Sequence, residues 1–334
     1  MKILISEPLP EAVHQETIER LSQLGEVRVS PDTKEETFRQ EVQDADIFVV
    51  RLAKVSAAVL ESAEKLRVIA RPAVGVDNID IEAATRLGIP IVYSPGSNTD
   101  STAEHTFALI LALDKHVCEA NAAAKEGRWG LRQQLTTQIR ELAGATLGII
   151  GLGAVGRRVA ELASAFRLRV IAHSEFASAE DARRLGAELT DMDTLLAESD
   201  YVTIHTALTE RTRGLINEQA LAKMKPSAFL INTARGPVID EDAVLAALDS
   251  GRIQGAALDV FSVEPPDPDH PLLKHPKVLV TPHIAGMSRD STKRMYDVAL
   301  DDLFRLLDGK PAQNVLNPQA LQGASSRLKG IVQG

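Results

Sequence analysis

A short apolar run at residues 146–156, TLGIIGLGAVG, ends in three glycines: Gly151, Gly153 and Gly156. A helix-compatible stretch, RRVAELASAF, follows directly. In such a strand–turn–helix unit the first glycine permits a tight turn, the second lets backbone approach a pyrophosphate, and the third lets helix and strand pack closely. The helix N-terminus then presents unpaired N–H groups and the positive end of its dipole. This pattern predicts a dinucleotide site.

Two details refine the predicted site. The backbone of Ala154 and Val155, at the start of the helix, is expected at the pyrophosphate. A second strand, residues 168–172, leads into His173, Ser174 and Glu175, close to where such folds place an acidic residue for the adenosine ribose. A glycine-rich turn that holds nothing is the alternative, and the flanking strand and helix favour dinucleotide binding over it.

Composition bounds the remaining possibilities. The length of 334 residues suggests about two domains, and 44% of the residues are hydrophobic. The formal net charge of −9 argues against nucleic acid as a partner, and the longest apolar stretch, residues 107–113, is too short to span a membrane. The N-terminus, MKILISEPLP, lacks a signal-peptide pattern. One cysteine, Cys118, fits a reducing, cytoplasmic setting and is expected to be a small core residue. No metal site is predicted.

Apolar runs of strand length alternate with helical patterns along the whole chain. The first series consists of KILIS, EVRVS, DIFVVR, RVIARP and IPIVYS. The second series follows the turn at residues 95–98 and consists of the glycine-motif strand and the runs at 169–172, 201–205, 228–232, 255–258 and 278–281. This alternation predicts an α/β fold with two doubly wound parallel-sheet domains. The first series lacks a phosphate loop and is expected to supply substrate contacts.

Three residues with versatile chemistry follow strands of the second series: Arg235 after FLIN, Glu264 after GAALDVF, and His283 after VLVT. In an open parallel sheet, ligands bind beyond the carboxyl ends of the strands, so these side chains are expected to converge at the nicotinamide end of the site. Taken singly, a strand-end ion pair, a solvated loop carboxylate and a turn histidine are the more ordinary interpretations. Their combination beside a phosphate loop favours a catalytic site.

The three side chains suit the reduction of a 2-oxo acid, which needs a hydride at the carbonyl carbon, a proton at its oxygen and a grip on the neighbouring carboxylate. The planar fork of Arg235 can hold that carboxylate. His283 can carry the proton, because an imidazole titrates near neutral pH. Glu264 would orient the imidazole and favour its charged form.

The segments GLGAVG, NTARG, GAALDVFSVEPP and TPHIAG, in this order, resemble those of the D-isomer-specific 2-hydroxyacid dehydrogenases. The resemblance implies that Arg235, Glu264 and His283 are the catalytic set and that the cofactor is NAD(H). It implies a Rossmann NAD-binding domain, residues 99–285, inserted in a flavodoxin-like substrate domain made of residues 1–98 and 286–334. It also implies a homodimer that acts on a small molecule.

Within that family the chain is most similar to the short type of 3-phosphoglycerate dehydrogenase. Arg51 and Arg71 match arginines that bind the substrate phosphate there, and a surface ion pair is the alternative for both. The loop with Val74 and Gly75 resembles the one whose N–H groups meet the substrate carboxylate, although Pro72 and Val74 replace smaller residues. Glyoxylate or hydroxypyruvate reductase is a second candidate, and a nucleotide-sensing corepressor a third of another class.

The ribose position departs from the family pattern. Ser174 stands where the family usually has an aspartate, and this loss can admit NADP. No Arg or Lys follows in EFASAED, and Glu175 can turn in to the ribose hydroxyls, so NAD is favoured and NADP remains possible. Asp259 resembles an aspartate that faces the nicotinamide amide, and the alternative is a buried cap of the backbone. The further residues expected along the dinucleotide are His205, Thr206, Thr233, Ala234 and Gly286.

Overall fold

The computed structural model describes residues 1–322 and 326–328. The chain folds into two compact units, one made of Met1–Asn98 with Ser288–Gly334 and the other of Thr99–Met287. The second unit is therefore inserted in the first. The chain returns to the first unit at Ser288. The sequence predicted that this return begins at residue 286.

The first unit contains a five-stranded parallel sheet with the strand order β2-β1-β3-β4-β5, which is the flavodoxin-like order. Its strands are β1 (Lys2–Ile5), β2 (Glu26–Val29), β3 (Ile47–Val49), β4 (Val68–Arg71) and β5 (Ile91–Tyr93). The central strands are buried, as expected for a parallel sheet covered on both faces.

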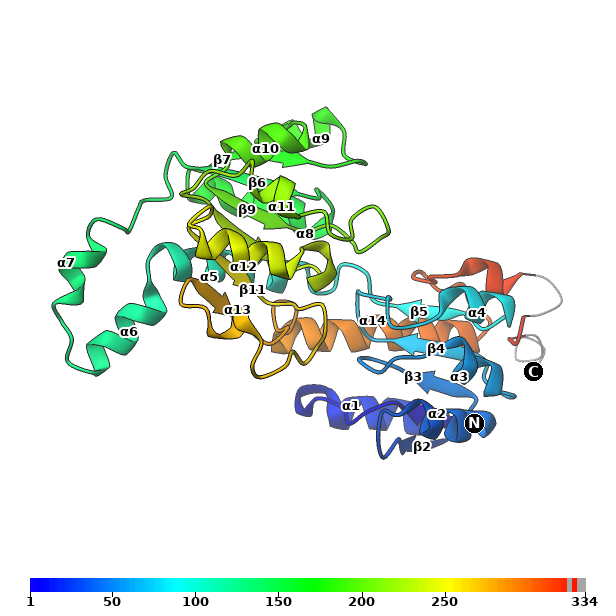
Figure 1. Cartoon of the computed structure of the whole chain (residues 1–334). Coiled ribbons are helices and arrows are strands. Elements are labelled where there is room, and N and C mark those ends of the chain that lie inside the picture. The colour runs from blue at the N-terminus through cyan, green and yellow to red at the C-terminus, as the bar shows by residue number, and fades with distance from the viewer. Residues whose placement is uncertain (323–325, 329–334) are drawn as a thin grey trace. The chain divides into compact units, whose positions relative to one another are not determined.

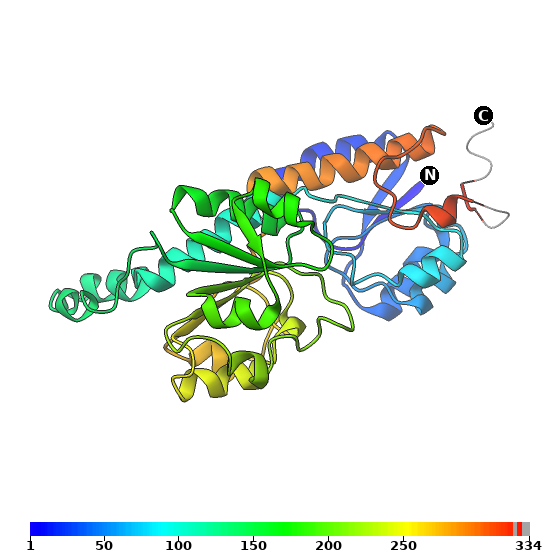
Figure 2. The same ribbon diagram turned by 90° about the horizontal axis from the view of Figure 1, so that it is seen from above.

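Helices cover both faces of this sheet. They are α1 (Glu11–Ser22), α2 (Glu35–Glu41), α3 (Ala57–Ser62), α4 (Ile81–Arg86) and α14 (Arg289–Leu307), with 3-10 turns at Val42–Asp44 and Pro318–Leu321. One core lies under α2, α3 and α4, and the other under α1 and α14, which lie side by side (Figure 2). Helix α14 begins with a capping box between Ser288 and Ser291, which satisfies backbone N–H groups at its start.

The second unit contains a seven-stranded parallel sheet with the order β12-β11-β10-β9-β6-β7-β8. Its strands are β6 (Thr146–Ile150), β7 (Arg169–His173), β8 (Ala187–Leu189), β9 (Tyr201–Ile204), β10 (Phe229–Asn232), β11 (Gly255–Leu258) and β12 (Val278–Val280). Taken from β8 to β11, this is the 3-2-1-4-5-6 order of the Rossmann fold. The predicted fold class is therefore confirmed. Successive strands are added on opposite sides of β6, because β7 and β8 lie on one side of it and β9 to β12 on the other.

Two cores, one on each face, hold the seven-stranded sheet. Its helices are α5 (Thr99–Asp114), α6 (Val117–Lys125), α7 (Leu131–Leu135), α8 (Ala154–Ala165), α9 (Ala179–Arg184), α10 (Met192–Glu198), α11 (Glu218–Leu221), α12 (Glu241–Asp249) and α13 (Pro271–Lys274), with a 3-10 turn at Gly236–Val238. Helices α5 and α8 pack on one face, and α10, α11 and α12 on the other (Figure 1).

Helices α6 and α7 extend away from the sheet of their own unit in both views (Figures 1 and 2). Cys118 lies on α6 and is exposed, so the prediction that it is a core residue was wrong. An alanine-rich stretch such as VCEANAAAK shows the same apolar pattern in a core and in a projecting helix.

Strand β8 is the one strand of the seven that the sequence analysis did not predict. It has three residues, AEL, with an exposed glutamate between apolar neighbours. Such a run is too short to show a period, and it is a strand because it pairs with β7. Among residues 1–322 and 326–328, no helix combines the length and apolar character needed to cross a bilayer.

Candidate active site and dinucleotide site

The three glycines of the predicted phosphate loop each meet a different steric demand. Gly151 has a φ of +95°, and a Cβ there would lie 2.8 Å from the carbonyl oxygen of His205. A Cβ on Gly156 would lie 2.0 Å from the carbonyl oxygen of Gly151, so α8 crosses β6 too closely for any side chain. Gly153 has no neighbour within 4 Å of its Cβ position. The loop is therefore tight against the protein and open at Gly153.

Helix α8 starts at Ala154 with Gly153 as its N-cap, and no side chain caps it. Gly153 and Ala154 are exposed, and Val155 is partly buried. The N–H groups of the first turn have no partner within a helix, and this end of the dipole is positive. An uncapped, open helix start beside an unobstructed glycine fits the pyrophosphate of a dinucleotide.

The predicted ribose residues lie beside the glycine loop. The backbone N–H of Gly151 donates to the carbonyl oxygen of His173 over 2.8 Å, so the residues after β7 start next to the loop. Ser174 is partly buried and Glu175 is exposed. The Oε2 atom of Glu175 accepts a hydrogen bond from the guanidinium of Arg211 over 2.7 Å. A basic residue from another loop therefore contacts Glu175, one of the residues predicted at the ribose.

His205 and Thr206 follow β9 on the other side of β6. The N–H of His205 donates to the carbonyl oxygen of Ile150, and the His205 Nε2 atom lies 2.9 Å from the hydroxyl of Thr203. Burial lowers the pKa of His205 to about 3, so its imidazole is neutral at physiological pH. A neutral ring beside Gly151 adds no charge to the loop.

Arg235 follows β10 on a turn that a buried asparagine shapes. The Asn232 side chain accepts from the N–H of Ala234 over 3.0 Å and donates to the carbonyl oxygen of Arg235 over 2.9 Å. A Cβ on Gly236 would lie only 2.2 Å from the carbonyl oxygen of Phe261, so the chain after Arg235 packs backbone to backbone against the loop that leads to Glu264.

Glu264 and His283 are in direct contact. The His283 Nδ1 atom lies 2.6 Å from the Glu264 Oε2 atom, and the other carboxylate oxygen, Oε1, accepts from the N–H of Phe261 over 2.9 Å. The His283 side chain is 44% exposed and the Glu264 side chain 35%, so a ligand can reach both. The Nδ1 atom is assigned as the donor to the carboxylate, and Nε2 is then the ring atom that can exchange a proton with a ligand.

The pKa of Glu264 lies below its ordinary value. Burial raises it, but hydrogen bonds from His283 and from the N–H of Phe261 lower it, as do the positive charges of His283 and Arg235. The net effect keeps the Glu264 carboxylate ionised at neutral pH. The charge of Arg235 thus acts on the same carboxylate that His283 contacts, which places the three predicted catalytic side chains in one electrostatic environment.

Asp259 holds the segment that carries His283. Its carboxylate, 1% exposed, accepts from the N–H of Ile284, from the N–H of Ala285 and from the hydroxyl of Thr281. The N–H of His283 donates to the Asp259 carbonyl oxygen over 2.8 Å. Asp259 therefore caps backbone, as in the structural alternative considered for it. Its contact with a nicotinamide amide stays a prediction.

The backbone of His283 has a φ of +53°, in the left-handed region that non-glycine residues rarely adopt, and the bonds to Asp259 hold it there.

The other residues predicted on the nicotinamide side are buried or partly buried. Thr233 is buried with its hydroxyl 3.1 Å from that of Thr106, and Ala234 and Gly286 are partly buried. The predicted nicotinamide-side residues thus follow β10 and β12.

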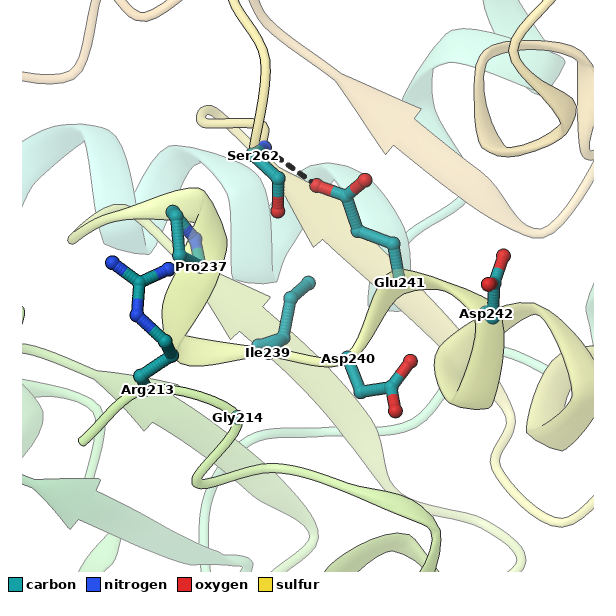
Figure 3. Close-up of a pocket in the computed structure, with 8 residues that line it drawn as sticks. All are labelled: Arg213, Gly214, Pro237, Ile239, Asp240, Glu241, Asp242 and Ser262. Carbon is teal, nitrogen blue, oxygen red and sulfur yellow. Dashed lines mark hydrogen bonds between the residues drawn. The ribbon is translucent and has the colours of Figure 1, made fainter. Parts of the chain in front are cut away.

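The loop of Glu264 has a second support, shown in Figure 3. The Oε1 atom of Glu241, at the start of α12, accepts from the N–H of Ser262 over 2.6 Å. Its Oε2 atom lies 3.3 Å from the Nε2 atom of His270. The shallow pocket drawn there is lined by Arg213, Pro237, Asp240, Asp242 and their neighbours, and contains none of the predicted site residues.

In the first unit, Arg71 and Gly75 contact each other. Arg71 is 6% exposed, and its guanidinium donates to the carbonyl oxygens of Gly75 and Val50 over 2.9 and 3.3 Å. The arginine therefore shapes the loop that contains Val74 and Gly75, both partly buried.

Arg51 lies in the same neighbourhood of the first unit as Arg71. Burial raises the pKa of Tyr296, and the positive charges of Arg51 and Arg71 oppose that rise while Glu7 adds to it. Both arginines thus act on one buried tyrosine. Arg51 is partly exposed and the more accessible of the two.

Two residues that contact the predicted site residues, Asn232 and Arg211, were not predicted from the sequence. Asn232 is fully buried and shapes the turn of Arg235, and an asparagine that ends a strand is a signal for such a side-chain-to-backbone turn. Arg211 reaches Glu175 from the loop after β9. Arg211 and Glu175 lie 36 positions apart, and no local sequence pattern predicts their contact.

The chain belongs to the D-isomer specific 2-hydroxyacid dehydrogenase family. Residues 107–285 match the NAD binding domain of that family. The chain is 41% identical to a D-3-phosphoglycerate dehydrogenase of Archaeoglobus fulgidus over 96% of its own length and 60% of that protein's length. It is 40% identical to a glyoxylate reductase of Aeropyrum pernix, over 93% and 95% of the two chains.

Among solved structures, an acyclic imino acid reductase in complex with NADPH and D-Arg has a TM-score of 0.86 and 27% sequence identity, over 95% of this chain and all of that one. The chain spans about 60% of the length of the D-3-phosphoglycerate dehydrogenases of Archaeoglobus and Methanocaldococcus that it matches. Relatives with this fold thus carry different substrate names, so the substrate has to be argued from the residues.

Asp259→Asn should destabilise the protein by about 2–3 kcal/mol, because an amide NH₂ would replace a carboxylate oxygen that accepts a buried N–H. Urea unfolding of the full chain, followed by circular dichroism, measures the change. Asp249→Asn is the control, since that side chain is 67% exposed, and its effect should stay within about 0.5 kcal/mol. Equal effects of the two substitutions would contradict the anchoring role of Asp259.

Proposed function

We propose that this chain is an NAD(H)-dependent oxidoreductase that interconverts a D-2-hydroxy acid and a 2-oxo acid. The single observation that carries the proposal is the 2.6 Å contact between His283 Nδ1 and Glu264 Oε2, beyond the strand ends of an NAD-binding domain. The charge of Arg235 acts on the same carboxylate. This set supplies a proton carrier, its orienting base and a carboxylate grip.

Each side chain has one task in this mechanism. The bound dinucleotide supplies or accepts the hydride. Arg235 holds the substrate carboxylate and polarises the adjacent carbonyl. His283 Nε2 gives its proton to the carbonyl oxygen during reduction and takes it from the hydroxyl during oxidation, while Glu264 accepts from Nδ1–H and stabilises the charged ring.

The proposed dinucleotide contacts follow the sequence-based assignment. The N–H groups of Ala154 and Val155 would hold the pyrophosphate beside Gly153. Ser174 and Glu175 would meet the ribose, and we favour NAD over NADP because Glu175 provides an acceptor for the ribose hydroxyls. The residues proposed along the rest of the dinucleotide are His205, Thr206, Thr233, Ala234, Asp259 and Gly286.

3-Phosphoglycerate and its 2-oxo counterpart are the proposed substrate pair, with glyoxylate or hydroxypyruvate as the alternative. The proposal is supported by Arg51 and Arg71, two cations that act on the same tyrosine in the first unit, and by D-3-phosphoglycerate dehydrogenases among the relatives. Arg71 already donates to two carbonyl oxygens, so Arg51 is assigned the larger share of phosphate binding. The glyoxylate reductase of similar identity supports the alternative.

The proposed setting is the cytoplasm, where a reducing environment suits the exposed Cys118. The proposed assembly is a homodimer. Trp129, between α6 and α7, is 72% exposed, and Val117, at the start of α6, is 52% exposed. Apolar side chains on a projecting segment are typical of a surface that a second subunit covers.

Steady-state reduction of 3-phosphohydroxypyruvate, hydroxypyruvate and glyoxylate with NADH tests the function and the substrate together. The phosphorylated substrate should have the highest kcat/KM. Arg51→Ala should raise its KM at least about tenfold and leave the unphosphorylated substrates unchanged, because only a phosphate uses the lost guanidinium. Lys54→Ala, an exposed cation three positions on, is the control. Higher turnover of glyoxylate would select the alternative, and no turnover of any of the three would refute the proposed activity.

Glu264→Gln should slow reduction on the order of 100-fold and move the high-pH limb of the rate profile to lower pH. A neutral amide stabilises the protonated imidazole less than the ionised carboxylate, so reduction, which needs the protonated ring, should be lost at lower pH. Rates between pH 5 and 9 measure the shift. His205→Asn should leave the limb in place, since burial keeps the pKa of His205 at about 3. If the high-pH limb of the rate profile is at the same pH in Glu264→Gln as in the wild type, the proposed role of Glu264 as the partner of His283 is wrong.

Sedimentation equilibrium of the full chain should give twice the chain mass of 36.1 kDa. Trp129→Glu should shift the protein toward monomer, because it places a charge on a surface that the second copy would bury. Phe176→Glu, an aromatic residue of the same unit that is 88% exposed, should leave the mass unchanged. A wild-type monomer at micromolar concentration would rule out the dimer.

A further inference from the structure

The ion pair between Glu175 and Arg211 lies between two loops that follow neighbours of the glycine-loop strand. Glu175 follows β7 and Arg211 follows β9, and these strands flank β6, which carries the glycine loop. The guanidinium lies 2.7 Å from the Glu175 Oε2 atom. The pair therefore joins the two loops on either side of the strand that leads into the phosphate loop.

The chemistry at this place differs from that of a strict NAD site. Such a site has a carboxylate that binds the ribose 2′-hydroxyl and repels a 2′-phosphate, whereas an arginine nearby accommodates the phosphate. Here Ser174 is neutral, and the carboxylate of Glu175 is matched by the charge of Arg211. One acceptor for a hydroxyl and one donor for a phosphate thus lie within hydrogen-bonding distance of each other.

Both side chains are accessible to a ligand. Arg211 is 74% exposed and Glu175 is 53% exposed. An exposed ion pair is weakly held, because water solvates both partners well. A 2′-phosphate can therefore replace the Glu175 carboxylate as the partner of Arg211, and the phosphate is the stronger acceptor because it carries more charge and more oxygens.

We infer that Arg211 is a specificity-determining residue that binds the 2′-phosphate of NADP(H), and that the protein accepts both NAD(H) and NADP(H). With NAD(H), Glu175 accepts from the ribose hydroxyls and Arg211 stays beside it. With NADP(H), Arg211 leaves Glu175 and pairs with the 2′-phosphate. The inference rests on the proposed dinucleotide function and adds a determinant from a loop remote in sequence.

Equilibrium binding of NADH and NADPH to the full chain, followed by the fluorescence of the reduced nicotinamide, tests the inference without turnover. The wild type should bind both, with Kd values within roughly 30-fold of each other. Arg211→Ala should raise the Kd for NADPH at least about tenfold and change the Kd for NADH less than about twofold, because only NADPH presents a 2′-phosphate to the guanidinium. Glu175→Ala should raise the Kd for NADH, and the Kd for NADPH should stay the same or fall.

Arg213→Ala is the matched control. Arg213 lies two positions on in the same loop but beside Pro237, in the pocket of Figure 3, and its removal should change neither Kd. The ratio of the NADPH Kd of Arg211→Ala to that of the wild type should also fall as the salt concentration rises, since salt screens an exposed charge pair. If Arg211→Ala changes the Kd values for NADPH and NADH equally, or changes neither, Arg211 does not bind the 2′-phosphate. If the wild type binds no dinucleotide, the proposed function itself fails.

Discussion

The parallel pairing of β7, β6 and β9 is the constraint on which the site depends. Parallel strands end at one edge of the sheet, so every loop that follows a strand starts from that edge. The close crossing of α8 over β6, which Gly156 alone permits, then brings an uncapped helix start to the same edge. The fold thereby gathers the glycine loop, the residues proposed for the ribose and the proposed catalytic side chains along one edge of the sheet.

Buried polar side chains then give those loops their shape. Asn232 folds the turn of Arg235, and Asp259 caps the segment of His283. A buried donor or acceptor that loses its partner costs about 1–3 kcal/mol, so these bonds restrict the loops to one conformation. They also offset the left-handed backbone of His283. The Glu264–His283 contact is thus built on backbone anchors rather than on the two side chains alone.

The sequence predicted the fold well where the physics is local. Strand and helix patterns repeat within each element, and the glycine spacing follows from one strand–turn–helix unit. The prediction did not include β8, because three residues carry no period, and it placed Cys118 in a core, because an apolar helix pattern does not say what lies opposite. The bonds from Arg71 to the carbonyl oxygens of Gly75 and Val50 were not predicted either, because the bond to Val50 needs β3 and β4 to be neighbours.

The sequence by itself determined the fold class and the presence of a dinucleotide loop, and it predicted which strand ends carry Arg235, Glu264 and His283, because each depends on residues close together in the chain. Only the tertiary structure decided what those residues touch. The 2.6 Å contact of His283 with Glu264 and the meeting of Glu175 with Arg211 join loops that follow different strands. The order of strands in the sheet sets such contacts, and that order is a property of the packed fold.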